Sequence, residues 1–229
     1  MNNYAIQKTW FSVFALAIGF AACASAQAIT IGQVDDFSDG VARWGEGEDI
    51  ASPNPPGVLL GGPGGESDRY LDNVSAGGVG GPGSRLTMFE TTFWAGDYTS
   101  AGVTGITLDL KNFGATALSI RLRVEGAGGS FRTNDVIELS AFGEWQTGSF
   151  SLAAEDLTGP GTDAALTLSG VSKLRVEHAP TADRANFQIP TIAARLGVDN
   201  ITAVPEPSSF ALAALTIATL LLGRGFRRR

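Results

Sequence analysis

The sequence predicts an all-β domain, an antiparallel β-sandwich or jelly roll, flanked by an N-terminal signal peptide and a C-terminal transmembrane helix. Apolar and polar residues alternate with period two in several short segments, and glycine-containing turns separate them. No segment sustains a helical period. The 30 glycines in 229 residues also favour turns and short strands over a helical bundle. Many short strands spaced by turns are typical of a sandwich or jelly roll.

The alternation is clearest in the second half of the chain. It runs over residues 106–111 and 118–125, and recurs in shorter form over 137–141, 150–152 and 173–177. One face of each segment is apolar and the other is polar. Each segment is therefore expected to be a half-buried strand.

Residues 27–203 are long enough to bury one sizeable core, so a single domain is expected between the two ends. Within it, residues 53–83 are rich in glycine and proline. We expect this stretch to be mostly loop, interrupted by a short strand around residues 70–74.

The first 26 residues are typical of a secretory signal. A polar stretch ends in Lys8, and an apolar run then extends to Cys23. Signal peptidase requires small side chains at the first and third positions before the cut, so Ala24 and Ala26 predict cleavage after Ala26. Acylation of Cys23, as in a lipoprotein, is the alternative.

The C-terminal end carries an apolar run over residues 210–223. At about 1.5 Å per residue, residues 208–223 span roughly 24 Å of helix, just short of the roughly 30 Å of a bilayer core. The basic cluster that follows indicates that the C-terminus stays in the cytoplasm. A plain membrane anchor is the simplest interpretation. The cluster consists of Arg224, Arg227, Arg228 and Arg229.

Pro205, Glu206 and Pro207 stand directly before this span. With the span and the arginines, residues 204–229 resemble the PEP-CTERM sorting signal of Gram-negative, polysaccharide-producing bacteria. The resemblance implies the export machinery and an exosortase-type membrane protease as partners. It also implies transient anchoring in the inner membrane and delivery to the cell surface or the extracellular matrix.

Four short motifs in the middle of the chain resemble the galactose-binding-like jelly roll, a fold common among carbohydrate-binding modules. They are Val34–Phe37, Gly65–Leu71, Gly143–Trp145 and Gly197–Ile201. In that fold the first and last strands lie side by side. The resemblance implies an antiparallel jelly roll and a carbohydrate ligand.

The same resemblance implies a structural Ca²⁺ that joins an acidic residue of the first strand to an aspartate of the last. Asp36 and Asp199 fall on the matching strands, with Asp39 and Asp68 as loop contributors. Calcium takes six to eight oxygen ligands and needs no histidine or cysteine. Hydrogen bonding of these carboxylates to turn backbone is the alternative.

Sugar binding needs aromatic faces flanked by polar side chains. Trp94, Asp97 and Tyr98 bring two rings and a carboxylate into one glycine-containing segment. Trp145 has the opposite parity to Phe150, so its ring should leave the core face. These four residues are the candidate carbohydrate contacts, and packing in the core is the competing interpretation for the aromatic ones.

Two strands also carry basic residues on their polar face. An anionic polysaccharide is one partner that such a basic strip would suit. Cross-strand pairing with Glu125 and Glu177 is the alternative. The residues of this strip are Arg121, Arg123, Lys173 and Arg175.

Composition excludes several classes of protein. Cys23 and His178 are the single cysteine and histidine, which excludes cysteine-rich zinc sites and multi-histidine metal centres. The net charge of -7 argues against nucleic acid as a partner. No serine motif accompanies His178, so a catalytic triad is not expected. The sequence predicts a non-catalytic protein that binds exopolysaccharide or builds the matrix; a glycan-active hydrolase or lyase is the alternative.

Overall fold

The computed structural model describes residues 28–47 and 55–205. The predicted signal peptide with Ala24 and Ala26 lies outside the described residues, and so does the sorting signal beyond Pro205. None of the helices in the described part of the chain is long and apolar enough to cross a membrane.

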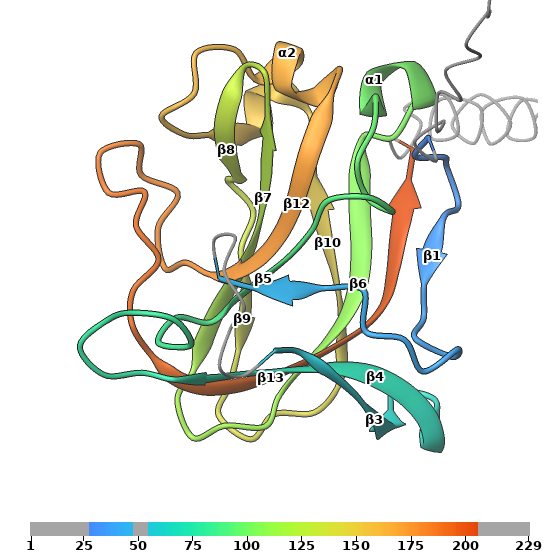
Figure 1. The fold of residues 1–229 in the computed structure, drawn as a ribbon, viewed down its shortest axis with the longest axis vertical. Coiled ribbons are helices and arrows are strands. Elements are labelled where there is room, and N and C mark those ends of the chain that lie inside the picture. The colour runs from blue at the N-terminus through green and yellow to red at the C-terminus, as the bar shows by residue number, and fades with distance from the viewer. Residues whose placement is uncertain (1–27, 48–54, 206–229) are drawn as a thin grey trace, which may run out of the picture.

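Two antiparallel sheets make up the domain (Figure 1), which confirms the predicted all-β class. Sheet A has the strand order β10 (Gln146–Ser151), β6 (Gly105–Asn112), β13 (Ala193–Val204), β4 (Gly65–Ala76) and β3 (Gly57–Gly62), with β1 (Val34–Asp35) also paired to β13. Sheet B has the order β11 (Leu157–Thr158), β8 (Gly129–Thr133), β7 (Leu118–Gly126), β12 (Val171–His178), β5 (Thr87–Glu90) and β2 (Gly45–Glu46), with β9 (Ile137–Leu139) on β7.

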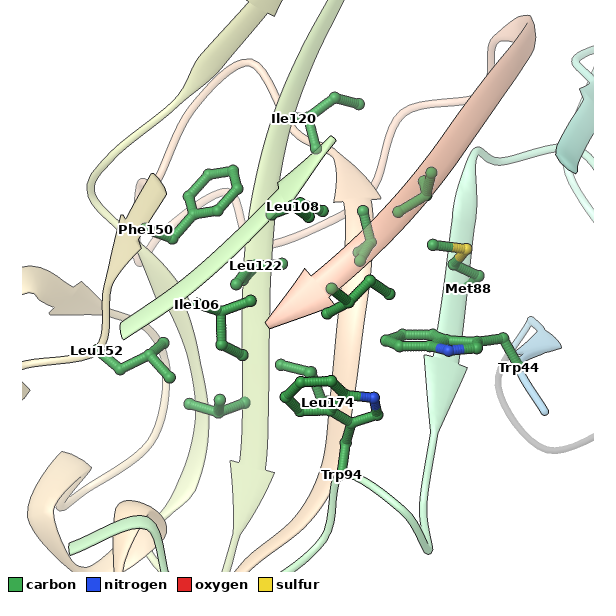
Figure 2. Packing of buried hydrophobic residues seen from close by; sticks show 14 of the residues in the cluster. Trp44, Met88, Trp94, Ile106, Leu108, Ile120, Leu122, Phe150, Leu152 and Leu174 are labelled. Atoms are coloured by element: carbon green, nitrogen blue, oxygen red, sulfur yellow. The ribbon is translucent and has the colours of Figure 1, made fainter. Parts of the chain in front are cut away.

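The apolar core lies between the inner faces of the two sheets (Figure 2). Ile106 and Leu108 of β6 face Leu122 of β7 and Leu174 of β12, and all four are buried. These are the apolar positions of the period-two segments, so the predicted strand faces are confirmed. Helical structure among the described residues is limited to α1 (Tyr98–Ala101), η1 (Ala154–Asp156) and α2 (Ala164–Leu168).

The glycine-rich stretch is more ordered than expected. Instead of a loop with one short strand, it contains the hairpin of β3 and the twelve-residue β4. Gly62 pairs with Gly65 across the turn. Gly65 has a φ of 116°, a backbone conformation that glycine adopts readily and other residues rarely adopt. The glycines therefore shape a turn between two strands, and the prediction of mostly loop is wrong.

The first and last strands lie side by side (Figure 1), as the jelly-roll resemblance implies. Val34 pairs with Thr202 and Asp35 with Ile201. The same edge of β13 pairs with β4 up to Val198. The neighbour changes at Asn200, which has a φ of 49° inside a bulge of β13.

Candidate functional site

Trp94 and Tyr98 are core residues and have no exposed surface. The Tyr98 hydroxyl donates a 2.9 Å hydrogen bond to the Trp94 carbonyl, and the Trp94 ring packs near Leu174 (Figure 2). The Asp97 carboxylate caps α1 by accepting from the Ser100 N–H at 2.9 Å. Sugar stacking requires an exposed ring face, so the competing interpretation of core packing is confirmed for Trp94 and Tyr98, and the prediction that these two rings bind carbohydrate is wrong. Asp97 is only half-buried, and its contact with carbohydrate stays a prediction.

Trp145 leaves the core face, as its parity predicts, and lies half-buried on the outer side of sheet A. Its ring meets Tyr70 edge-on at a centroid distance of 5.3 Å and Phe113 at 6.0 Å. The backbone of Gly197 lies beneath these rings, where a Cβ would come within 2.8 Å of Trp145 and 2.7 Å of Phe113. Gly197 therefore provides the space for this aromatic cluster.

A small cavity of about 170 Å³ lies beside Trp145. The polar side chains of Glu138, Glu144 and Gln146 also line it. This arrangement of one ring and several hydrogen-bonding groups suits a sugar. The contact between Trp145 and carbohydrate stays a prediction.

Most of the predicted basic strip is not an exposed surface. Arg175 is fully buried, and its guanidinium donates to Glu125 at 2.7 Å and to the Gly47 carbonyl at 2.7 Å. Arg121 is also buried and donates to the carbonyls of Ala179 and Thr133. The alternative of cross-strand pairing is confirmed for Lys173 and Arg175, which pair with Glu125, and for Arg123, which pairs with Glu177. Arg121 instead donates to backbone carbonyls.

The connection between β12 and β13, residues 179–192, covers part of the outer face of sheet B (orange in Figure 1). Its carbonyls accept hydrogen bonds from Arg132 of sheet B and from Arg85, which precedes β5. Arg132 of β8 donates to Thr181 at 3.0 Å and to Phe187 at 3.2 Å, while the Nε–H of Arg85 donates to Ile189 at 2.8 Å. A guanidinium has five N–H donors, so one arginine can hold several carbonyls of the connection at once. We call residues 179–192 the covering loop.

A buried ion pair lies under the covering loop. Arg132 and Glu177 have no exposed side-chain surface beyond 1%, and Nε of Arg132 lies 2.5 Å from Oε1 of Glu177. Burial raises the pKa of Glu177, while the nearby charges of Arg132 and Arg123 oppose the rise. The guanidinium of Arg132 also lies 4.3 Å from the Phe187 ring centroid, which holds that ring against the sheet.

Beside this pair, the covering loop and sheet B enclose a cavity of about 410 Å³, which we call the arginine cleft. Among the described residues, its lining includes three arginines and one aromatic ring but no aspartate or glutamate. It is more than twice the volume of the cavity beside Trp145. The lining residues are Arg85, Arg123, Pro160, Arg184, Ala185, Phe187, Gln188 and Ile189.

Sequence reasoning found Arg123 of this cleft and missed the rest. Arg123 stood out because it alternates with core residues on a predicted strand. Arg85 follows a glycine-rich loop, and Arg184 and Phe187 lie on the covering loop, which carries no periodic pattern. Their proximity depends on the tertiary path of residues 179–192, for which the sequence contains no signal that we recognise.

Asp199 is the most buried of the four predicted calcium ligands, with 1% exposure. Burial raises its pKa to about 7, and the charges of Asp68, Asp109 and Asp36 add to the rise. Its carboxylate accepts the Asn200 N–H at 2.7 Å, and no lysine or arginine in the described chain pairs with it. A cation here would neutralise a charge that the fold otherwise disfavours.

The other three predicted ligands each have a partner within their own turn. Asp36 accepts from Ser38 at 2.8 Å, Asp39 pairs with Arg43, and Asp68 accepts the Gly64 N–H at 2.6 Å. No three aspartate, glutamate, histidine or cysteine side chains form a metal-binding group within residues 28–47 and 55–205. The calcium site therefore stays a prediction centred on Asp199.

No family model matches the sequence, and no curated protein matches it. Solved structures are similar in fold. An exo-β-agarase aligns with a TM-score of 0.55 and 14% identity over 78% of this chain, which spans only 25% of the agarase chain. The family 11 carbohydrate-binding module of the Clostridium thermocellum cellulase Lic26A-Cel5E aligns with a TM-score of 0.48 and 15% identity, over 78% of this chain and 96% of the module.

A third neighbour is the family 30 carbohydrate-binding module of a Clostridium thermocellum cellulosomal cellulase. Its TM-score is 0.41 and its identity 15%, over 78% of this chain and 94% of the module. Carbohydrate-binding modules are thus among the structural neighbours. At such identities the likeness is one of fold.

Proposed function

We propose that residues 27–203 form an exported, non-catalytic domain that binds polysaccharide in the arginine cleft. The observation that carries this proposal is the cleft itself, a cavity of about 410 Å³ with one aromatic ring among polar side chains. Small-molecule sites typically enclose about 300–1,000 Å³ and combine apolar walls with a few polar groups. A sugar needs both, because its ring has apolar faces and its hydroxyls need hydrogen bonds.

The wall of the cleft is held in place before any ligand binds. Arg132 donates to two carbonyls of the covering loop, and Arg85 donates to a third. Arg132 and Arg123 lie 4.3 and 4.8 Å from the centroid of the Phe187 ring. A preformed wall reduces the entropy lost on binding, which favours a binding role for this surface.

The lining of the cleft favours binding over hydrolysis. Glycoside hydrolysis ordinarily uses two carboxyl groups that flank the scissile bond. The described residues that line the cleft include none. His178 lies elsewhere, buried, with its Nδ1 accepting the Ser119 N–H at 3.0 Å. The described residues that line the cleft therefore do not support the alternative, a glycan-active hydrolase or lyase.

Export and sorting are the second part of the proposal. The N-terminal signal carries the chain out of the cytoplasm, and residues 204–229 hold it transiently in the inner membrane for an exosortase-type protease. The domain then reaches the cell surface or the extracellular matrix, where exopolysaccharide is available. The order of Pro-Glu-Pro, apolar run and arginine cluster at the C-terminal end supports this.

A polysaccharide panel tests the binding proposal. The exported protein is passed over immobilised exopolysaccharide of its own cells and over neutral and acidic polysaccharides. We expect retention on at least one of them. If none of the polysaccharides retains the protein while its thermal unfolding transition is intact, only a structural role in the matrix is left.

For the sorting proposal, removal of residues 205–229 should release the domain into the periplasm or the medium. Immunodetection on whole cells measures the effect. A truncated chain that is displayed on the surface as before refutes the sorting role of the tail.

A further inference from the structure

We propose that the ligand of the arginine cleft is an acidic polysaccharide, whose carboxylate or sulfate groups are bound by Arg85, Arg123 and Arg184. This inference rests on the proposed function and names the class of its ligand. Three guanidinium groups line one cavity, with no described carboxylate among the lining residues.

The three arginines differ in how their charge is balanced. Arg123 lies 3.1 Å from Glu125 and 3.9 Å from Glu177, so its charge is already compensated by the sheet. Arg85 and Arg184 form no ion pair with any residue that the structure describes. Arg85 and Arg184 thus have no ion-pair partner among the described residues, and an anionic ligand would provide one.

Arg85 is positioned to donate outward. Its Nε–H is used by the Ile189 carbonyl at 2.8 Å, which fixes the guanidinium at the wall of the cleft. Its two terminal amino groups donate no hydrogen bond within the described residues. A guanidinium presents its donors in a planar fork that matches the oxygens of carboxylate and sulfate.

The domain is acidic overall, which makes the cluster of Arg85, Arg123 and Arg184 unusual. Residues 27–204 contain 22 acidic and 11 basic side chains. The net field of the domain therefore repels polyanions, so an acidic chain would bind only where local cations outweigh that field. Nucleic acid is disfavoured for the same reason, because it needs an extended basic surface.

Apolar groups in the same cavity favour a sugar chain over a small inorganic anion. Phe187, Pro160 and Ile189 line the cleft together with the arginines. The Phe187 ring and the aliphatic groups can pack against sugar rings while the guanidiniums bind the acid groups. An anion without an apolar body would leave these surfaces in contact with water.

The test is affinity electrophoresis of the exported protein in gels that contain polygalacturonate, dextran sulfate or neutral dextran. We expect retardation in at least one acidic gel, and the two acidic arms distinguish carboxylate from sulfate. The double variant Arg85→Gln/Arg184→Gln should weaken that binding at least about tenfold, because charged hydrogen bonds are lost. Raised NaCl should weaken wild-type binding, but DNA should not displace the ligand.

Arg195→Gln is the control, since it removes one arginine charge from the opposite sheet, where the double variant removes two charges from the cleft. Its side chain is 42% exposed and pairs with Asp72 on the outer face of sheet A. We expect wild-type binding from it, and thermal unfolding confirms that all variants are folded. Equal binding by the double variant and wild type, or full displacement by DNA, overturns the inference. Retention in neutral gels alone also overturns it but leaves the proposed function standing, whereas no retention in any gel counts against both.

Discussion

Arg132 and Glu177 form an ion pair with a 2.5 Å contact, fully buried beneath the covering loop. Arg132 also donates to two carbonyls of that loop, so the pair connects the sheet to one wall of the arginine cleft. A guanidinium this deeply buried needs both its carboxylate and its carbonyl acceptors. The shape of the proposed binding site thus depends on a buried charge pair that is not among the residues lining the cleft.

Glu177→Gln should destabilise the domain strongly. The substitution leaves the buried charge of Arg132 without its carboxylate, and breaking a buried pair in this way typically costs about 3–5 kcal/mol of unfolding free energy. Urea denaturation measures the loss. Glu144→Gln is the control, because its carboxylate is 93% exposed and should change stability by less than about 1 kcal/mol. Similar stabilities for the two variants would show that the pair is not needed.

Because its pKa is raised, Asp199 should make the domain less stable as pH rises when divalent cations are chelated. The folded state keeps this carboxyl protonated up to about pH 7, whereas the unfolded chain releases the proton near 3.8. The folded state therefore binds more protons in that window, and unfolding free energy falls as pH rises through it. Asp199→Asn removes this contribution.

Denaturation curves at several pH values, taken in EDTA for wild type and Asp199→Asn, measure that contribution. Between about pH 4 and about pH 7, we expect the unfolding free energy of the wild type to fall by at least about 1 kcal/mol more than that of the variant. Parallel pH profiles for the two proteins would contradict the raised pKa.

Calcium bound at Asp199 should reverse the effect of pH. Binding to the ionised carboxylate stabilises the folded state, so EDTA at pH 8 should lower the melting temperature of wild type by roughly 5 °C from its value in Ca²⁺. Asp199→Asn should not respond, and Mg²⁺ should not replace Ca²⁺. A wild-type transition that is the same in EDTA and in Ca²⁺ removes the calcium prediction for Asp36, Asp39, Asp68 and Asp199.

Gly197→Ala should destabilise the aromatic cluster of sheet A. The added methyl group would meet the rings of Phe113 and Trp145 at less than 3 Å, and such overpacking typically costs about 1–3 kcal/mol. Gly170→Ala is the control, because no atom lies within 4 Å of its new methyl group. In a Trp145→Ala background the cost of Gly197→Ala should shrink. If the cost of Gly197→Ala is unchanged in that background, the Trp145 ring is not what restricts the size of the side chain at position 197.

The strand framework could be predicted from the sequence because each strand carries its own pattern. The apolar residues Leu118 to Val124 alternate because one face of β7 meets the core, and that constraint is local. The pairing of β1 with β13 came from resemblance alone, since no local pattern joins Val34 to Thr202. The β3–β4 hairpin was missed because its glycines are also typical of loops.

The candidate site could be predicted only in part, because burial by a distant segment leaves no local pattern. Alternation placed Arg121 and Arg175 away from the core correctly, but it carries no information about the covering loop that buries them. For Trp94 and Tyr98 the sequence leaves both carbohydrate contact and core packing open, and the structure confirms core packing. They lie in an irregular segment with glycine and aspartate, yet the segment turns its rings inward to the core.

Binding of polysaccharide by Phe187→Ala tests the central claim most directly. Phe187 lines the cleft and makes no contact with the core cluster, whereas Phe142 is exposed elsewhere, so Phe142→Ala is the matched control. Calorimetric titration with the polysaccharide that retains the wild type should show at least about tenfold weaker binding by Phe187→Ala, from the loss of one sugar-stacking ring, and wild-type binding by Phe142→Ala. Undiminished affinity in a folded Phe187→Ala variant would contradict polysaccharide binding in the arginine cleft.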